Sequence, residues 1–310
     1  MERRQPPRHA ASRRGGQTSM TLGIILLVLS AMTGTIPFIL MIIQSNHSQA
    51  LAAQHAAAVE NIDRQTIDGE LQDAYDYNRR LSDGGQNVIG EAADPWSGSG
   101  EPLSSTDSAY RGRLVIPPDG IMATVRYPRL GINLPVRHGT GSDSLDRGAG
   151  HLYGTSLPVG GENTHAVISA HSGLADQLMF DKLNGFGMKA EQGDVFYLDV
   201  LGETLAYKVV SINVVDPDDF TKLKIESGRD LVTLLTCTPY GINDHRLLVT
   251  GERTSMPQEK TEQASTDRTN IYFMLYIIGF WTIAILGAIV GRSRGGRKRK
   301  RHVRKKHAKR

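Results

Sequence analysis

The sequence of 310 residues predicts a mainly β domain of about eight strands, a barrel or a sandwich, with a helical lead-in and two transmembrane helices. Three observations predict this class. Short apolar and β-branched segments alternate with turn residues between positions 110 and 253, two long apolar runs lie near the two ends, and a proline-free stretch rich in Ala, Glu and Gln follows the first run. Short strands at regular spacing are typical of all-β barrels and sandwiches.

The charge distribution places both ends at a membrane. Of the 36 basic residues, five lie in residues 1–19 and twelve in residues 292–310. These two segments together contain only one of the 32 acidic residues. The remainder holds 19 basic and 31 acidic residues, a net charge of −12. Basic ends also suit nucleic acid, but each end here flanks an apolar run, and positive flanks stay in the cytoplasm. We expect cytoplasmic termini, an outward-facing middle and no nucleic-acid partner.

The apolar runs are residues 22–43 and 271–290, each as long as the roughly 20 residues that a transmembrane helix needs. A cleaved signal peptide is the alternative for the first run, because Ala50-Leu-Ala52 offers a small-residue cleavage site. The run exceeds the roughly 7–15 residues of a typical signal core. We therefore expect an uncleaved anchor and a two-pass protein of the cytoplasmic membrane, with its catalytic domain outside.

The predicted organisation follows the chain in order. The lead-in has Leu71, Tyr75 and Asn78 on one helical face, which indicates packing against the domain, and Gly69 predicts a break. A linker rich in Gly, Ser, Asp and Pro follows. The predicted segments are a basic tail (1–21), a transmembrane helix (22–43), the lead-in (44–81), a lid or linker (82–108), the β domain (109–253), a linker (254–270), a transmembrane helix (271–290) and a basic tail (291–310).

Within the β domain, apolar runs bounded by turn residues predict the strands, and apolar residues three and four apart predict a short helix over residues 174–183. No internal repeat is present. The predicted strands are residues 114–116, 121–127, 132–136, 166–170, 194–200, 203–215, 231–237 and 246–251.

The last two predicted strands bring the only cysteine toward an arginine. Cys237 ends the first of them, a turn containing Pro239, Gly241 and Asn243 follows, and Arg246 begins the second. In an antiparallel hairpin, with strands about 4.8 Å apart, Cys237 and Arg246 face each other. A nearby cation favours the thiolate and stabilises an oxyanion. The alternative is a small buried core cysteine.

His171 is the candidate proton carrier, because it too follows an apolar strand and precedes a glycine turn, giving a Cys/His pair of strand ends. The other histidines of this region are expected at the surface or as caps: His138, His151, His165 and His245. Strand alternation places His245 on the face opposite Arg246.

Asp94-Pro-Trp96 lies inside the linker. A tryptophan in a polar stretch carries a large apolar area, so we expect Trp96 to dock against another part of the chain. A turn that merely contains a tryptophan is the alternative.

These residues carry a family resemblance. Thr233-Leu-Leu-Thr-Cys237 resembles the Thr-Leu-x-Thr-Cys motif of sortases, and the stretch from Thr236 to Arg246 and beyond resembles the class C, pilus-assembling branch in Gram-positive bacteria. His171, followed by Ser-Gly-Leu, is similar to the sortase catalytic histidine. Asp94-Pro-Trp96 resembles the class C lid, in which Trp96 would cover Cys237 and Asp94 would pair with Arg246. The resemblance covers roughly residues 94–253.

The resemblance implies an eight-stranded sortase barrel and a cysteine transpeptidase. Cys237 would attack a Leu-Pro-x-Thr-Gly-like sorting signal between Thr and Gly, Arg246 would stabilise the oxyanion and orient the peptide, and His171 would act as general acid and base. The acceptor would be a lysine of a pilin subunit, which makes pilins the partners.

Other functions stay open at this point. They are a housekeeping sortase that anchors proteins to the cell wall, a hydrolytic cysteine peptidase, and a membrane-anchored β domain without catalysis. No zinc-like spacing, Walker loop or EF-hand loop occurs in the sequence, so we expect no metal and no cofactor.

Overall fold

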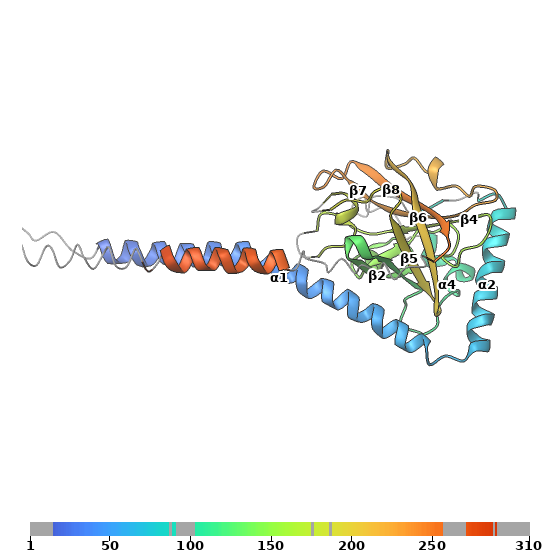
Figure 1. Cartoon of the computed structure of the whole chain (residues 1–310), viewed down its shortest axis with the longest axis horizontal. Coiled ribbons are helices and arrows are strands. Elements are labelled where there is room, and N and C mark those ends of the chain that lie inside the picture. Colours follow the sequence, from blue (N-terminus) through green and yellow to red (C-terminus); the bar gives the residue numbers. More distant parts are fainter. Residues whose placement is uncertain are drawn as a thin grey trace, which may run out of the picture. The chain divides into compact units, whose positions relative to one another are not determined.

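The computed structural model describes residues 15–86, 89–90, 103–174, 177–185, 188–256, 271–287 and 289 (Figure 1). The chain divides into two compact units. One comprises Met1–Ile39 with Asn270–Arg310, and the other Leu40–Thr269. Helix α1 (Gly15–Val59) begins in the first unit and ends in the second.

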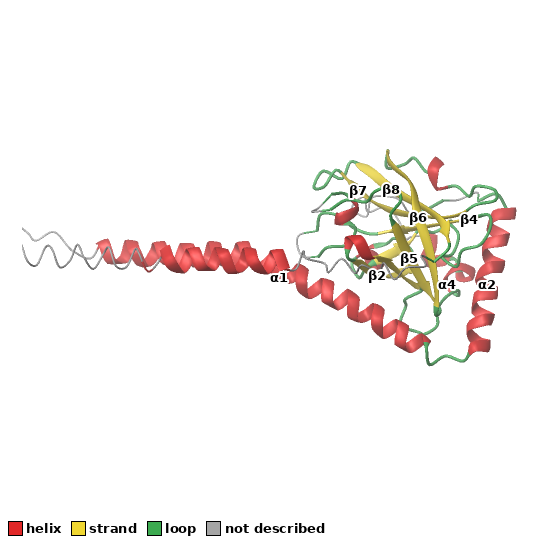
Figure 2. Cartoon of the chain, in the orientation of Figure 1, coloured by secondary structure: helices red, strands yellow, loops and turns green. Residues whose placement is uncertain are grey.

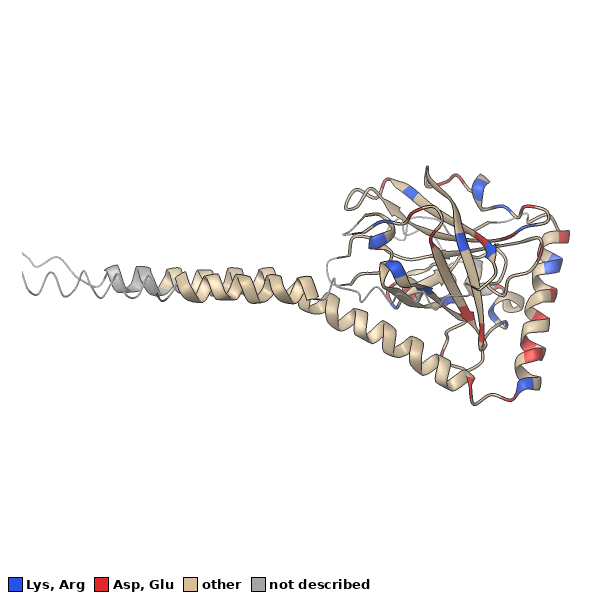
Figure 3. Ribbon diagram, viewed as in Figure 1, with Lys and Arg blue, Asp and Glu red and all other residues tan. Residues whose placement is uncertain are grey.

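The described part of the first unit is helical. Helix α1 contains no Lys, Arg, Asp or Glu, as Figure 3 shows for its described length. Its segment Ile25–Val59 is long and apolar enough to cross a membrane, with a mean hydropathy of 2.3 over an 18-residue stretch, a test that a signal sequence near the N-terminus would also pass. The C-terminal helix Ile271–Gly287 is apolar but shorter than that segment. Phe38 of α1 contacts Phe273 of this helix, with ring centroids 4.9 Å apart.

The lead-in of the second unit is the end of α1 followed by α2 (Arg64–Asp83). The predicted break at Gly69 is wrong: Gly69 lies inside α2, and the chain turns at residues 60–63. Asp63 fixes that turn, because its side chain caps the helix by accepting the Thr66 N–H at 2.9 Å. The buried face of α2 packs on the β domain, where the Asn78 amide both donates to and accepts from the Leu157 backbone. The expected docking face is thereby confirmed.

The eight strands of the second unit close into a barrel in the order β1-β2-β3-β4-β7-β8-β6-β5. Figure 2 shows the strands in yellow and the helices in red. The pairs β2–β3 and β4–β7 are parallel and the others antiparallel. The strands are β1 (Ala123–Tyr127), β2 (Ile132–His138), β3 (Ala149–His151), β4 (Thr164–Ser169), β5 (Val195–Val200), β6 (Glu203–Val215), β7 (Asp230–Thr238) and β8 (His245–Thr254).

Short helices fill the connections. They are α3 (Leu103–Thr106), α4 (Ser108–Arg111), α5 (Ser142–Leu145) and the 3-10 turns η1 (Pro128–Leu130), η2 (Asp181–Leu183) and η3 (Thr221–Leu223). The helix predicted over residues 174–183 is wrong for the described positions, of which only the turn η2 is helical.

Two strand predictions also differ from the structure. Residues 114–116 form no strand, because Leu114 has a left-handed backbone (φ 53°) and donates its N–H to the Glu70 carboxylate of α2. Strand β3 was not predicted, since it has only three residues and the glycine-rich sequence Ala-Gly-His.

The core of the barrel is built by strand alternation. In β2, Ile132, Leu134 and Val136 belong to the main hydrophobic cluster, whereas Asn133 points away from it. Phe196 and Tyr207 stack inside, with ring centroids 5.8 Å apart. Burial of these side chains holds the barrel together and fixes the strand ends on which the candidate site lies.

Candidate active site

Cys237 and His171 come from neighbouring parallel strands. Ser169 of β4 pairs with Leu235 of β7; Cys237 lies two positions further along β7, and His171 lies two positions beyond the end of β4. In parallel strands, two residues that follow a paired position by the same number of residues also lie next to each other. The barrel therefore brings these two sequence-predicted residues to the same edge, with the Cys237 thiol free of any disulfide and its residue partly buried.

Thr236 ties the two strand ends together. A backbone bond between them runs from the Ala170 N–H to the Leu235 carbonyl at 3.2 Å. One residue further, the Thr236 hydroxyl donates to the Ala170 carbonyl at 2.8 Å, and the Thr236 side chain is fully buried. Thr236 precedes Cys237 and Ala170 precedes His171, so this bond sets the spacing of the pair. Thr236 belongs to the predicted motif Thr233-Leu-Leu-Thr-Cys237, but this contact of its hydroxyl was not predicted.

Arg246 lies directly opposite Cys237 in the antiparallel β7–β8 hairpin, as predicted. The residue is only 5% exposed, and its Nη1 donates to the carbonyls of Asn243 and His245 at 3.2 and 3.1 Å. The Nε and Nη2 atoms of Arg246 have no hydrogen-bond partner within the described ranges. His245 lies half exposed on the other face, which confirms the alternation.

Asn184, after the turn η2, holds the backbone of the cysteine. Its amide nitrogen donates to the Cys237 carbonyl at 3.0 Å, and its amide oxygen accepts the Thr238 hydroxyl at 2.6 Å. Sequence reasoning missed Asn184. A residue 53 positions away with no motif around it gives no indication of this contact before the fold is known.

His171 lies in a largely buried position at the start of a closed loop. The Phe180 N–H donates to the His171 carbonyl at 3.0 Å, and the buried Asp181 carboxylate accepts the N–H groups of Gly173 and Met179, both at 2.8 Å. The His171 side chain is 13% exposed, and its Nε2 lies 3.8 Å from Asp146 Oδ1. Burial lowers the pKa of His171, while the charges of Asp146 and Asp181 act in the opposite direction.

The other histidines lie outside this pair, but two of them are not where they were expected. His151 is fully buried: its Nε2 donates to the Ser156 carbonyl at 2.7 Å, so its Nδ1 accepts from the Tyr110 hydroxyl at 2.9 Å. Burial lowers the pKa of His151 to about 4. Its surface placement was wrong because the neighbouring Tyr110, on α4, covers it. His138 is partly buried and donates to the Arg113 carbonyl at 2.8 Å.

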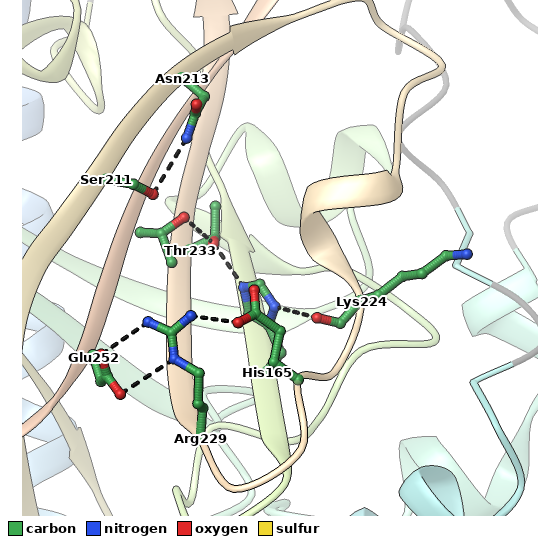
Figure 4. Close-up of polar contacts among 9 residues, drawn as sticks. His165, Ser211, Asn213, Lys224, Arg229, Thr233 and Glu252 are labelled. Carbon is green, nitrogen blue, oxygen red and sulfur yellow. Dashed lines mark hydrogen bonds and ion pairs between the residues drawn. The ribbon is translucent and has the colours of Figure 1, made fainter.

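His165 is also fully buried, in the polar network of Figure 4. Its Nδ1 donates to the Lys224 carbonyl at 2.8 Å, so its Nε2 accepts from the Thr233 hydroxyl at 2.7 Å. Beside it, Arg229 forms an ion pair with Glu252 at 2.8 Å. Burial lowers the pKa of His165. Both of its nitrogens are committed to neighbours, which fits a structural role.

Two further expectations concern metal binding and the lid. Across the described ranges, no group of three His, Cys, Asp or Glu side chains is placed to hold a metal ion. Asp94 and Trp96 lie outside the described residues.

The chain matches known proteins across this site. A family model described as the sortase domain matches residues 125–254. Solved structures are also similar to the chain, among them the following three. Sortase C-1 from Actinomyces oris is 46% identical with a TM-score of 0.55, covering 62% of this chain and 99% of its own. Sortase C1 of GBS pilus island 1 is 37% identical with a TM-score of 0.60, and the match covers 70% of this chain and 97% of its own.

The third is sortase C of Streptococcus pneumoniae, which is 38% identical with a TM-score of 0.57 and covers 67% of this chain and 97% of its own. The family model runs from within β1 to the end of β8 and so includes both strand ends of the site. The chain is a cysteine transpeptidase that belongs to the sortase family, in its class C branch.

Proposed function

We propose that the chain cleaves a Leu-Pro-x-Thr-Gly-like sorting signal between Thr and Gly and joins the acyl group to a lysine amine of a pilin subunit. The observation that carries this is the placement of Cys237 and His171 on adjacent parallel strand ends, with Arg246 opposite the cysteine. Two similar structures support the substrate class, since one belongs to a pilus island and the other is described in terms of pilin substrate specificity.

The proposed reaction has two halves. The Cys237 thiolate attacks the threonine carbonyl, the peptide C–N bond breaks, and His171 gives its proton to the leaving glycine amine. The resulting thioester is then attacked by the lysine amine, which returns a proton to His171 as the C–S bond breaks. Each half moves one proton through one imidazole, so the enzyme ends as it began.

Arg246 suits the oxyanion role on geometric grounds. Two carbonyls fix its Nη1, while Nε and Nη2 remain without partners in the described structure. A guanidinium held in this way meets a developing oxyanion without reorganising. The lowered pKa of His171 favours the neutral imidazole, which is the form that accepts a proton from the incoming amine.

We also propose that Asp94-Pro-Trp96 acts as a lid over Cys237, on the resemblance of these residues to the class C motif. The test is the rate at which iodoacetamide alkylates Cys237 in the full chain and in Trp96→Ala. A faster reaction in the variant supports a lid, and equal rates would remove it.

Two-pass anchoring is the proposed location, with both basic ends in the cytoplasm and the barrel outside. Its support is the apolar α1, the apolar helix Ile271–Gly287 and the basic residues beyond each. In a Cys237→Ala background, Ser12→Cys and His302→Cys should react with a membrane-impermeant maleimide only after cell lysis. Labelling of either position in intact cells would contradict this topology.

The function itself is tested with the purified full chain in detergent, a sorting-signal peptide and a lysine-bearing pilin peptide. Mass spectrometry should detect a threonyl–lysine isopeptide with the wild type and none with Cys237→Ala. A product ending in a free threonine carboxylate would indicate a hydrolytic peptidase. Joining only to a cell-wall amine would indicate a housekeeping sortase, and an unchanged product with Cys237→Ala would exclude the proposed nucleophile.

A further inference from the structure

Two carboxylates lie near His171, and the proposed reaction uses neither. Both oxygens of Asp181 accept backbone N–H groups of the loop that follows His171, so this carboxylate is committed to closing the loop. Asp146 differs. Its Oδ1 lies 3.8 Å from His171 Nε2, and its side chain has no other hydrogen-bond or ion-pair partner in the part of the chain that the structure describes.

The turn that carries Asp146 is rigidly placed on the barrel. Its own N–H caps α5 by donating to the carbonyls of Ser142 and Ser144, and the preceding Leu145 is buried. A Cβ atom at Gly150 would lie 2.2 Å from the Gly139 carbonyl oxygen, so the two backbones on either side of this turn are in direct contact. Asp146 is therefore presented to His171 by a fixed turn and not by a free loop.

The charges that act on His171 are those of Asp146 after α5 and Asp181 in η2, and the titratable Cys237 at the end of β7 lies beside it, opposite Arg246 of β8. Burial disfavours the protonated imidazole, and an opposite charge within about 4–6 Å favours it. Asp146 is the carboxylate whose distance to the ring is within that range and whose oxygens are not otherwise engaged.

We propose that Asp146 is a positioning residue that stabilises the protonated form of His171, the form that gives its proton to the leaving amine. This inference rests on the proposed role of His171. At 3.8 Å the contact is electrostatic and longer than a hydrogen bond. Because 67% of the Asp146 side chain is exposed, the interaction is moderate and sensitive to salt.

The experiment is an NMR titration of the full chain in detergent micelles, with histidine labelled at Cε1 and the His171 resonance identified by His171→Asn. The Cys237→Ala background removes the coupled thiol. Asp146→Asn should lower the His171 pKa by about 0.2 to 0.7, from the usual strength of exposed ion pairs. Asp143→Asn, which removes the same charge from α5 itself, should leave the His171 pKa unchanged. Asp146→Glu keeps the charge, so its His171 pKa should stay close to the wild-type value.

Two further readouts separate this role from a structural one. In 1 M salt, where the screening length is about 3 Å, the difference between wild type and Asp146→Asn should shrink. With Cys237 present, transpeptidation by Asp146→Asn should fall about two- to fivefold, as a shift of this size implies. Equal His171 titrations in Asp146→Asn and Asp143→Asn would overturn the inference.

The titration needs no turnover, which keeps the two proposals apart. A shifted His171 pKa in a chain that forms no thioester would retain the contact between Asp146 and His171 and remove the proposed function. A thioester on Cys237 with an unshifted His171 pKa would retain the function and remove the role of Asp146.

Discussion

Replacing Thr236 by valine tests whether the spacing of the two strand ends depends on one hydroxyl. Valine keeps the shape of the fully buried threonine but loses the bond to the Ala170 carbonyl. A buried acceptor left without its partner costs about 1–3 kcal/mol. For a domain of this size, each kcal/mol lowers the melting temperature by roughly 2–4 °C, so we expect a fall of roughly 2 to 12 °C.

The same change should reduce activity more than it reduces stability. Thr236 and Ala170 directly precede Cys237 and His171, so loss of the bond lets the reacting groups separate. A displacement of about 1 Å can cost about 100-fold in rate. We expect a fall of about 10- to 100-fold in peptide transpeptidation at a temperature where the variant is folded by circular dichroism.

Thr236→Ser is the matched control, because it keeps the hydroxyl and loses only a methyl group. Serine should retain most of the activity and of the melting temperature. If Thr236→Val melted and reacted like Thr236→Ser, the hydroxyl would not set the spacing, and the reasoning would be refuted.

Three other predictions follow from single contacts. A lysine side chain lacks the planar guanidinium of arginine, so Arg246→Lys should lower the transpeptidation rate by about 100-fold or more. The rate at which Cys237 is alkylated should change little. Equal losses in the two assays would contradict an oxyanion role for Arg246. Asn184→Asp keeps an acceptor for the Thr238 hydroxyl but loses the donor to the Cys237 carbonyl, so its transpeptidation activity should fall. Asn184→Ala loses both contacts and should be less active still. Full activity in Asn184→Ala would show that these contacts do not hold the cysteine in place. Folding holds the pKa of His151 at about 4 against 6.5 unfolded, so the free energy of unfolding should fall by up to about 3 kcal/mol between pH 6.5 and 4. Urea titrations of wild type and His151→Gln would check this, and equal pH dependence would contradict it.

The hairpin that carries Cys237 and Arg246 was predictable because its determinants are local. An apolar strand, a turn with Pro239 and Gly241 and a second strand fix the register within about twenty residues, and the structure pairs the two as expected. The long apolar helix near the N-terminus was predictable for the same reason, from a run of apolar residues without a charge.

What the sequence did not reveal depends on contacts between distant segments. Asn184 reaches Cys237, and Asp146 reaches His171, only once the barrel is closed. Strand β3 is too short and too rich in glycine to show a pattern, and it forms because β2 and β4 flank it. The burial of His151 was missed because the covering Tyr110 lies 41 residues earlier.

The same limit applies to the lead-in. Gly69 suggested a break, yet packing of the α2 face on the barrel outweighs the roughly 1 kcal/mol that glycine costs within a helix. The turn instead forms at Asp63, whose side chain satisfies a free N–H at the start of α2. A capping residue was the better indicator here than a glycine.

The central claim is that the Cys237 thiol at the end of β7 carries the acyl group of a sorting signal. The most direct measurement is the intact mass of the purified full chain in detergent after incubation with a Leu-Pro-x-Thr-Gly peptide and no acceptor amine. We predict an adduct with the mass of the peptide up to its threonine, released by hydroxylamine and absent in Cys237→Ala. An adduct that persists in Cys237→Ala, or no adduct while the wild type still joins the two peptides, would contradict the claim.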